Sequence, residues 1–257
     1  MKLYIIGAGP GAPDLITVRG LKLIQEADVI LYADSLVNEE LMNEGKPSAE
    51  IIKTAGMHLE EMVSLMVDRV KEGKKVVRVH TGDPAVYGAI MEQISLLKAA
   101  NVEVEIVPGV SSVFASAAAV GAELTIPDLT QTVILTRAEG RTPVPEREKL
   151  KALASHHCTI ALFLSATLTK KVVKELIEAN WSPETPVAVV YKASWPDEKI
   201  VHSTLQNLDE DMKRNGIRKQ AMILAGWALD ATIHEKEYRS KLYDKAFTHG
   251  FRKGVTS

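Results

Sequence analysis

Three glycine-containing loops hold the residues of this chain whose types and spacing best suit ligand chemistry. They are Gly7-Ala8-Gly9-Pro10-Gly11, Thr81-Gly82-Asp83-Pro84 and Pro108-Gly109-Val110-Ser111-Ser112. Each loop follows a short apolar segment that predicts a buried strand. Because ligands of open parallel sheets bind beyond the carboxyl ends of the strands, the three loops together predict one crevice at that edge. Their coincidence is more informative than any one of them.

The first loop leaves several interpretations open. A glycine-rich turn between a strand and a helix suits an anionic group, since backbone N–H groups face it. Pro10 and Pro13, however, remove two amide donors that a phosphate cradle would use. Asp34 follows the second predicted strand, where a ribose-binding acid would sit, so an NAD site is one alternative. A tight turn without any ligand is another.

The second and third loops carry polar side chains beside flexible backbone. Gly82 lets the backbone approach a ligand, and Asp83 can accept hydrogen bonds from hydroxyls or a protonated amine. The alternative is an Asx turn in which Asp83 only caps the following helix. Ser111 and Ser112 can likewise contact a ligand or simply cap a helix.

The first half of the chain alternates predicted strands with predicted helices. The strands are expected over 3–6, 29–32, 75–80 and 102–107, and the helices over 14–27 (capped by Asp14), 59–72, 86–100 and 112–120. This alternation predicts a mostly parallel sheet with helices on both faces.

The second half is expected to hold a mixed sheet with flanking helices. Strands are predicted over 132–136, 159–164, 187–191, 199–204 and 221–226, with a helix over 169–179. The turn at Trp195-Pro196-Asp197 is short enough to make a hairpin of its two flanking strands. The sequence thus predicts an α/β fold with domains at 1–121 and 122–232, and a charged tail at 233–257 that is helical over 236–247.

Composition excludes several classes of protein. The chain has 257 residues, with 31 Lys and Arg against 33 Asp and Glu, so its formal charge is −2. That balance argues against a nucleic-acid partner or an acidic membrane surface, which require a basic excess. The 46% hydrophobic and 25% charged residues argue against global disorder.

The single cysteine, Cys158, excludes an internal disulfide and a multi-cysteine metal cluster. The run His156-His157-Cys158 is expected to bind no metal, because neighbouring side chains on a strand face opposite sides. Met57, Met62 and Met66 are expected to fill the core. No apolar run is long enough to span a membrane and no signal-peptide pattern precedes Gly7, so we expect a cytoplasmic protein.

Longer blocks extend the three loops into a family resemblance. They are YADSLV at 32–37, HTGDPAVYGAIMEQ at 80–93, PGVSSVFASAAAVG at 108–121, QTVILTRAEGRTPVP at 131–145 and YKASWPDEKIV at 191–201. With the GAGPG loop they resemble the tetrapyrrole methylases, which are S-adenosylmethionine-dependent enzymes of sirohaem and cobalamin biosynthesis. The resemblance covers about residues 1–230. It is strongest to the branch that methylates precorrin-4 or cobalt-precorrin-4 at C-11.

The resemblance implies a two-domain α/β methyltransferase with the cofactor folded between its domains. It further implies a homodimer, an anionic tetrapyrrole or corrinoid substrate, S-adenosylhomocysteine as product and no protein-bound metal. Carried over residue by residue, it implies cofactor contacts at Pro10, Thr81, Gly82, Asp83, Val86, Ser111, Ser112, Leu164 and Ala193.

The catalytic base is the point at which the sequence departs from the uroporphyrinogen-specific relatives. Asp34 matches their aspartate after the second strand, displaced by the inserted Ala33, and is the candidate base. Their lysine has no counterpart, because the block 53–58 reads KTAGMH. Arg137, Arg141 and Lys192 are candidate partners for the carboxylates of the substrate. The alternatives are a sister methylase acting at another ring carbon, an NAD-dependent oxidoreductase and a non-catalytic binding protein.

Overall fold

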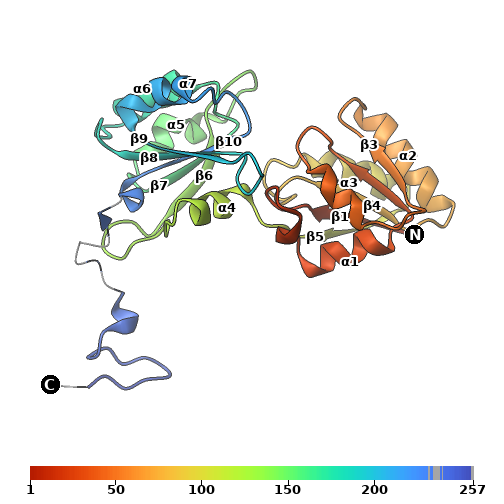
Figure 1. The fold of residues 1–257 in the computed structure, drawn as a ribbon, viewed down its shortest axis with the longest axis horizontal. Helices are drawn as coiled ribbons and strands as arrows, with labels where there is room; N and C mark the ends of the chain where they lie inside the picture. The colour runs from red at the N-terminus through yellow and green to blue at the C-terminus, as the bar shows by residue number, and fades with distance from the viewer. Residues whose placement is uncertain (231, 234–237, 239, 256–257) are drawn as a thin grey trace. The chain divides into compact units, whose positions relative to one another are not determined.

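A computed structural model describes residues 1–230, 232–233, 238 and 240–255 of the chain (Figure 1). The described chain divides into two compact units. Unit 1 comprises Met1–Ser116 together with Lys192–Glu198, and unit 2 comprises Ala117–Tyr191 and Lys199–Ser257. The short segment 192–198 therefore belongs to unit 1, although both strands that flank it belong to unit 2.

Unit 1 is built on a five-stranded parallel sheet. Its strands are β1 (Lys2–Gly7), β2 (Val29–Tyr32), β3 (Glu50–Lys53), β4 (Val76–His80) and β5 (Glu103–Val107), in the order β3-β2-β4-β1-β5. Every pairing in this sheet is parallel, which confirms the predicted architecture. The order brings the carboxyl ends of β4, β1 and β5 side by side, and the three glycine loops start at those ends.

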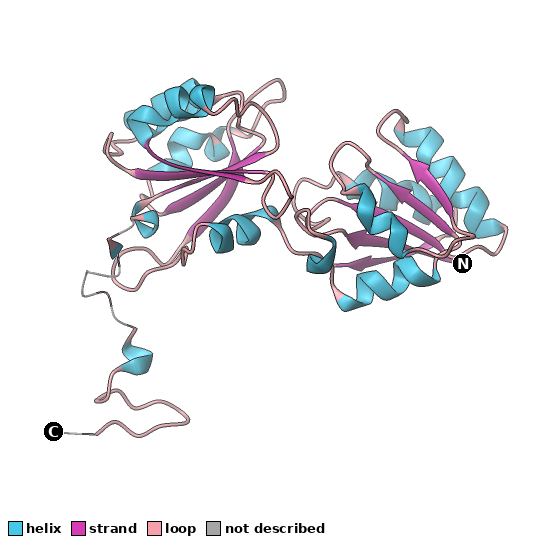
Figure 2. Ribbon diagram, viewed as in Figure 1, coloured by secondary structure: helices cyan, strands magenta, loops and turns pink. Residues whose placement is uncertain are grey.

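Helices cover both faces of the sheet of unit 1 (Figure 2). On one face, α2 (Leu59–Lys71) and α3 (Ile90–Ala99) bury an apolar cluster that includes Met62 and Met66. On the other face, α1 (Val18–Glu26) and the 3-10 helix Glu39–Glu44 pack against alternate residues of the same strands. Alternate residues of the central strands enter opposite clusters because a strand points successive side chains to opposite faces.

Two helices begin later than the sequence predicts. The helix expected to start at Asp14 begins at Val18, where the Thr17 hydroxyl accepts the amide of Gly20, and Asp14 lies in a separate 3-10 turn. The helix expected from Val86 begins at Ile90. The backbone between the second loop and α3 makes tight turns, with Tyr87 and Ala89 in the left-handed region.

Unit 2 contains a mixed sheet in the order β6-β7-β10-β8-β9. Its strands are β6 (Val133–Arg137), β7 (Thr159–Phe163), β8 (Pro186–Tyr191), β9 (Lys199–Thr204) and β10 (Ala221–Ala225). Only β6 and β7 pair in parallel; β8 and β9 form the predicted antiparallel hairpin. Three helices bury one face of this sheet, namely α5 (Leu150–Ala154), α6 (Thr169–Glu178) and α7 (Leu208–Arg214).

The helix predicted to open at Ser112 is present, whereas the part of the predicted tail helix that the structure describes holds only a short turn. The short helix α4 covers Ser112–Ala119, as predicted to within one residue. The predicted tail helix over 236–247 falls partly on residues 236, 237 and 239, which lie outside the described residues; of its remainder, Lys241–Tyr243 makes one 3-10 turn. None of the helices in the described part of the chain has the length and apolar character needed to cross a membrane.

Candidate functional site

The three predicted loops of unit 1 meet through their glycines. A Cβ atom added to Gly109 would lie 2.2 Å from the carbonyl oxygen of Gly82, and one added to Gly7 would lie 2.6 Å from the Cα of Gly109. Gly82 itself has a φ of +58°. No side chain fits at Gly7 or Gly109, because backbone closely approaches backbone at both positions, whereas the positive φ is what favours glycine at position 82.

The amides of the first loop are largely committed to the protein. Ala8 N donates to His80 O (2.7 Å), Gly9 N to Gly82 O (3.3 Å) and Ala12 N to the Ser194 hydroxyl (2.9 Å). Pro10 and Pro13 have no amide hydrogen to offer. Because a phosphate cradle needs a set of free amides, this loop is not built as the pyrophosphate site of an NAD enzyme.

Asp83 joins the second loop to the third. One carboxylate oxygen accepts the amide of Ala85 (2.8 Å), and the other accepts the amide of Gly109 (2.9 Å). The first bond is the Asx turn that the sequence offers as an alternative, and the second is a long-range tie. A carboxylate has further acceptor positions, so these two bonds leave room for a ligand contact.

The segment Lys192–Glu198, distant in the sequence, packs against the first loop. The Trp195 indole donates to Pro10 O (3.0 Å), and the Ser194 hydroxyl accepts the amide of Ala12. Sequence reasoning assigned Trp195 to a hairpin turn and missed this contact. A tryptophan in a turn offers a weak signal of it, because such a large ring needs a surface to cover.

The remaining predicted cofactor contacts are distributed over both units. In unit 1, Thr81 is exposed, Val86 is half-buried and Ala193 is buried. In unit 2, Leu164 directly follows β7 with a φ of +51° and a side chain that is 70% exposed. A large apolar residue that is both strained and exposed is uncommon outside functional sites.

Ser111 and Ser112 open α4, which begins at Ser112. The buried Ser111 hydroxyl accepts the amide of Val113 at 3.5 Å. The backbone carbonyl of Ser111 accepts the amides of Phe114 and Ala115. Ser111 therefore performs the capping role that the sequence offers for it, at the end of the third loop.

Asp34, the candidate base, lies at the carboxyl end of β2. Its side chain is exposed, and one oxygen accepts the amide of Ala55 at 3.0 Å. Nearby, the Tyr32 hydroxyl donates to Glu39 (2.8 Å), and Glu39 also pairs with Lys53. Burial together with the bond to Glu39 raises the pKa of Tyr32, and the bond from Lys53 lowers the pKa of Glu39.

A buried polar cluster lies where β4 faces α3. Arg78, His80 and Gln93 are each more than nine-tenths buried, and each has a side-chain polar atom with no hydrogen-bond partner among the described residues. Burial lowers the pKa of Arg78 to about 10. Burial, and then the charge of Arg78, lower the pKa of His80 to about 3, so this histidine is neutral at physiological pH.

The three candidate substrate cations have different surroundings. The Arg137 guanidinium donates to the carbonyls of Thr142 (3.2 Å) and Pro143 (2.8 Å), so it shapes its own loop. Lys192 pairs with Asp197 at 2.7 Å. Arg141 is exposed and makes no hydrogen bond or ion pair with the described residues. Of these three side chains, Arg141 is the most available to an anionic ligand.

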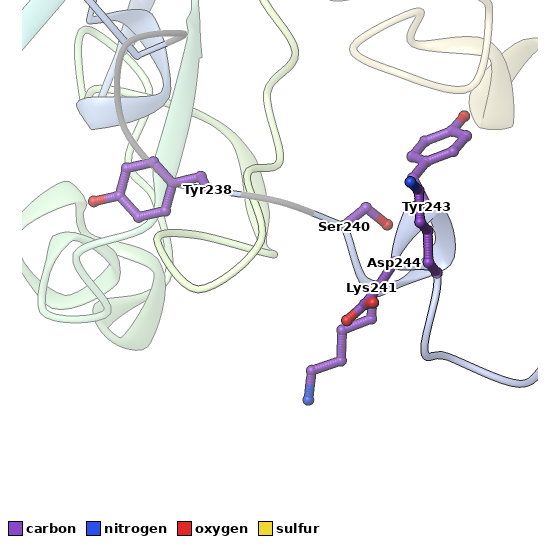
Figure 3. A pocket seen from close by; sticks show the side chains of 6 residues that line it. Tyr238, Ser240, Lys241, Tyr243 and Asp244 are labelled. Carbon is purple, nitrogen blue, oxygen red and sulfur yellow. The ribbon is translucent and has the colours of Figure 1, made fainter. Parts of the chain in front are cut away.

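Two other features carry no functional argument. His156, His157 and Cys158 lie in the turn before β7 and not on the strand, and the His157 ring stacks against Trp181 with centroids 6.1 Å apart. No group of three possible metal ligands occurs in the described part of the chain. A pocket in the tail is lined by Tyr238, Ser240, Lys241, Tyr243, Asp244 and Lys245 (Figure 3). None of these residues was predicted to belong to a site.

Comparison with known proteins places the chain among corrin and porphyrin enzymes. The family model described as "Tetrapyrrole (Corrin/Porphyrin) Methylases" matches residues 2–209. A cobalt-precorrin-4 C(11)-methyltransferase from Priestia megaterium is 76% identical over 257 residues, covering the whole of both chains.

Two solved structures share the fold. The X-ray structure of a cobalt-precorrin-4 methyltransferase superimposes with a TM-score of 0.88 at 76% identity, covering 89% of this chain and 96% of that one. A uroporphyrin-III C-methyltransferase from Thermus thermophilus, complexed with S-adenosylhomocysteine, gives a TM-score of 0.75 at 28% identity, with coverages of 90% and 94%.

Proposed function

The chain belongs to the tetrapyrrole methylase family, and on that premise we propose that it methylates cobalt-precorrin-4, or precorrin-4, at C-11. It is an S-adenosylmethionine-dependent C-methyltransferase, and its reaction belongs to the biosynthesis of the corrin ring of cobalamin. The observation that carries the position of methylation is the 76% identity, over the full length, to a cobalt-precorrin-4 C(11)-methyltransferase.

The reaction mainly requires the protein to align the methyl donor with the acceptor carbon. The methyl group passes from the sulfonium of S-adenosylmethionine to C-11 of the macrocycle, and S-adenosylhomocysteine leaves as a neutral thioether. Since the leaving group is good, the protein has to hold the two reactants in line and keep water away. The loops of unit 1 pack closely at their glycines and are joined by the hydrogen bond from Gly109 to Asp83, so they supply a rigid surface for that task.

The proposed cofactor contacts of unit 1 fit a ligand of this chemistry. Gly82 and the buried Ala193 present backbone and small side chains, which suit the flat adenine and the methionine chain. Asp83 and Ser111 add polar groups to hydrogen-bond the hydroxyls and the amine. Pro10, Thr81, Val86 and Ser112, with Leu164 of unit 2, complete the proposed set.

Asp34 is the proposed base for the proton that the macrocycle loses. Its exposed carboxylate has one oxygen bonded to the backbone and can accept a proton from a bound substrate. Arg141 is the proposed partner for a substrate carboxylate, assisted by Arg137 and Lys192. No resident metal is proposed, and cobalt enters only as part of the substrate.

A labelling experiment tests the position of methylation. The purified enzyme is given isotope-labelled S-adenosylmethionine and the cobalt-precorrin-4 or precorrin-4 precursor, and the product is examined by mass spectrometry and NMR. We expect one new labelled methyl group, at C-11. Label at another ring carbon would make the chain a sister methylase and leave its family membership intact.

The assembly and location of the enzyme are two further parts of the proposal. We propose a homodimer, as the family resemblance implies, and analytical ultracentrifugation of the purified chain tests it by mass. We also place the reaction in the cytoplasm, where a protein with a single buried cysteine needs no oxidising compartment. Cell fractionation followed by immunoblotting tests that location.

A further inference from the structure

The segment Lys192–Glu198 holds the first glycine loop through three distinct contacts. The Trp195 indole N–H donates to Pro10 O at 3.0 Å, and the Ser194 hydroxyl accepts the amide of Ala12 at 2.9 Å. Between these bonds the indole covers Gly11 so closely that an added Cβ would lie 2.1 Å from its Cδ1 atom. The segment 192–198 thus contacts each residue from Pro10 to Ala12.

Hydrogen bonds and an ion pair within the segment Lys192–Glu198 stabilise its own conformation. Ser194 N donates to Glu198 at 2.6 Å, and Lys192 pairs with Asp197 while its ammonium lies 5.1 Å from the centre of the Trp195 ring. Lys192 and Ser194 both have left-handed backbone, with φ of +48° and +68°. Non-glycine residues persist in that region only when their surroundings enforce it, so this turn keeps a fixed shape.

The end of the first glycine loop depends on hydrogen-bond partners from other parts of the chain. Two of its residues, Pro10 and Pro13, cannot donate backbone hydrogen bonds, and Gly11 has no side chain to pack. Two further hydrogen bonds reach Pro10–Ala12 from elsewhere in unit 1: the Asn38 side-chain amide donates to Gly11 O (3.1 Å), and Leu15 N donates to Ala12 O (3.1 Å). Without the 192–198 segment, the stretch from Pro10 to Ala12 would lose two of these four hydrogen bonds and the indole that covers Gly11.

We propose that Trp195 and Ser194 are positioning residues for the cofactor, acting through Pro10 and Ala193. This inference rests on the proposed function, in which both of those residues border S-adenosylmethionine. Ala193 lies within the braced segment itself, and Pro10 is held by its indole. One turn therefore sets the positions of two cofactor-bordering residues that are 183 places apart in the sequence.

The first experiment measures S-adenosylhomocysteine binding by calorimetric titration. Trp195→Phe keeps a ring over Gly11 but loses the bond to Pro10, so we expect about fivefold weaker binding, or about 1 kcal/mol, at a nearly unchanged melting temperature. Trp195→Ala loses the ring as well and should bind more weakly still. The matched control is Trp227→Phe, an equally conservative change at a tryptophan of unit 2, which should bind as the wild type does.

A second experiment tests the contact itself. Gly11→Ala should weaken binding at least about tenfold in the wild type, because its new methyl group meets the indole. In the Trp195→Ala background, where the ring is gone, the same change should add little.

The outcomes separate the two proposals. Wild-type protein that fails to bind S-adenosylhomocysteine would contradict the proposed function. Wild-type protein that binds, with Trp195→Ala binding equally well or with additive effects of the two substitutions, would overturn the positioning role alone.

Discussion

At the scale of single residues, the glycine positions are the part of the site that the sequence predicts best. The sequence places Gly7, Gly82 and Gly109 in three loops and predicts that the loops meet. It does not show that the glycines touch, because their contacts depend on the order of β4, β1 and β5 in the sheet. That order follows from long-range strand pairing, which single-sequence patterns do not encode.

The contact leads to a prediction about stability. Gly109→Ala should lower the free energy of unfolding by about 3 kcal/mol or more, since its Cβ would lie 2.2 Å from Gly82 O. Gly56→Ala is the control: nothing lies within 4 Å of its added Cβ, so it should be neutral or stabilising by up to about 1 kcal/mol. Urea denaturation measures both, and equal stabilities would contradict this contact.

Asp83 shows how a correct choice of residue can have more than one role. Its sequence context allows either a ligand contact or an Asx turn, and the structure shows the turn together with a bond to Gly109. Asp83→Ala should therefore weaken S-adenosylhomocysteine binding and also lower stability, by about 2 kcal/mol for a charged hydrogen bond. Asp83→Asn retains an acceptor for one amide and should lose less of both, which thermal melts and titration would reveal.

At the scale of elements, periodicity predicts the buried parts and misses the exposed or short ones. All four strands predicted in the first half are present, whereas the edge strand β3 is missed because Glu50–Lys53 has no buried run. The helices α5 and α7 are missed because five and seven residues are too few to show a helical period. The late start of α1 is local: the Thr17 hydroxyl caps this helix, whereas Asp14 lies in the separate 3-10 turn that begins at Pro13.

A buried histidine at the end of β4 leads to a prediction about how stability depends on pH. Its last residue, His80, has a pKa of about 3 in the folded protein against about 6.5 when unfolded. The unfolded state thus binds the extra proton between these values, and stability falls as pH drops through that window. From pH 7 to pH 5 this one group should remove about 2 kcal/mol from the free energy of unfolding.

Substitution at two histidines isolates this effect. His80→Gln should show a shallower loss of stability between pH 7 and pH 5 than the wild type. His156→Gln, at an exposed position, should keep the wild-type pH dependence. If all three proteins lose stability in parallel, His80 is not the group responsible.

At the scale of the whole molecule, charge has to act locally. The formal charge is −2, so a substrate rich in carboxylates gains no general attraction from the protein. Arg141→Gln should raise the KM for substrate by about twofold to fivefold with kcat nearly unchanged, and should weaken the dependence of KM on salt. Arg137→Gln should also lower stability, because that guanidinium braces its own loop. An Arg141 variant with wild-type KM at low salt would exclude this side chain.

The family and the α/β class were accessible from the sequence because five blocks occur in order over most of the chain. The predicted division at 1–121, 122–232 and 233–257 stays a prediction. What the sequence could not reveal is that Lys192–Glu198 belongs with the first unit. A hairpin turn has the same local signature wherever it packs, and only tertiary contacts assign it.

That assignment of Lys192–Glu198 has a consequence for biosynthesis on the ribosome. The first segment of unit 1 ends at residue 116, yet the indole that covers Gly11 is encoded 185 residues after Pro10. At ordinary translation speeds the gap between residues 116 and 195 takes on the order of ten seconds to synthesise. During that interval the nascent unit carries an uncovered glycine loop, so the last step of its maturation waits for the second half of the chain. Ligand competence therefore arises late, and a message truncated before codon 192 would yield a sheet without a finished site.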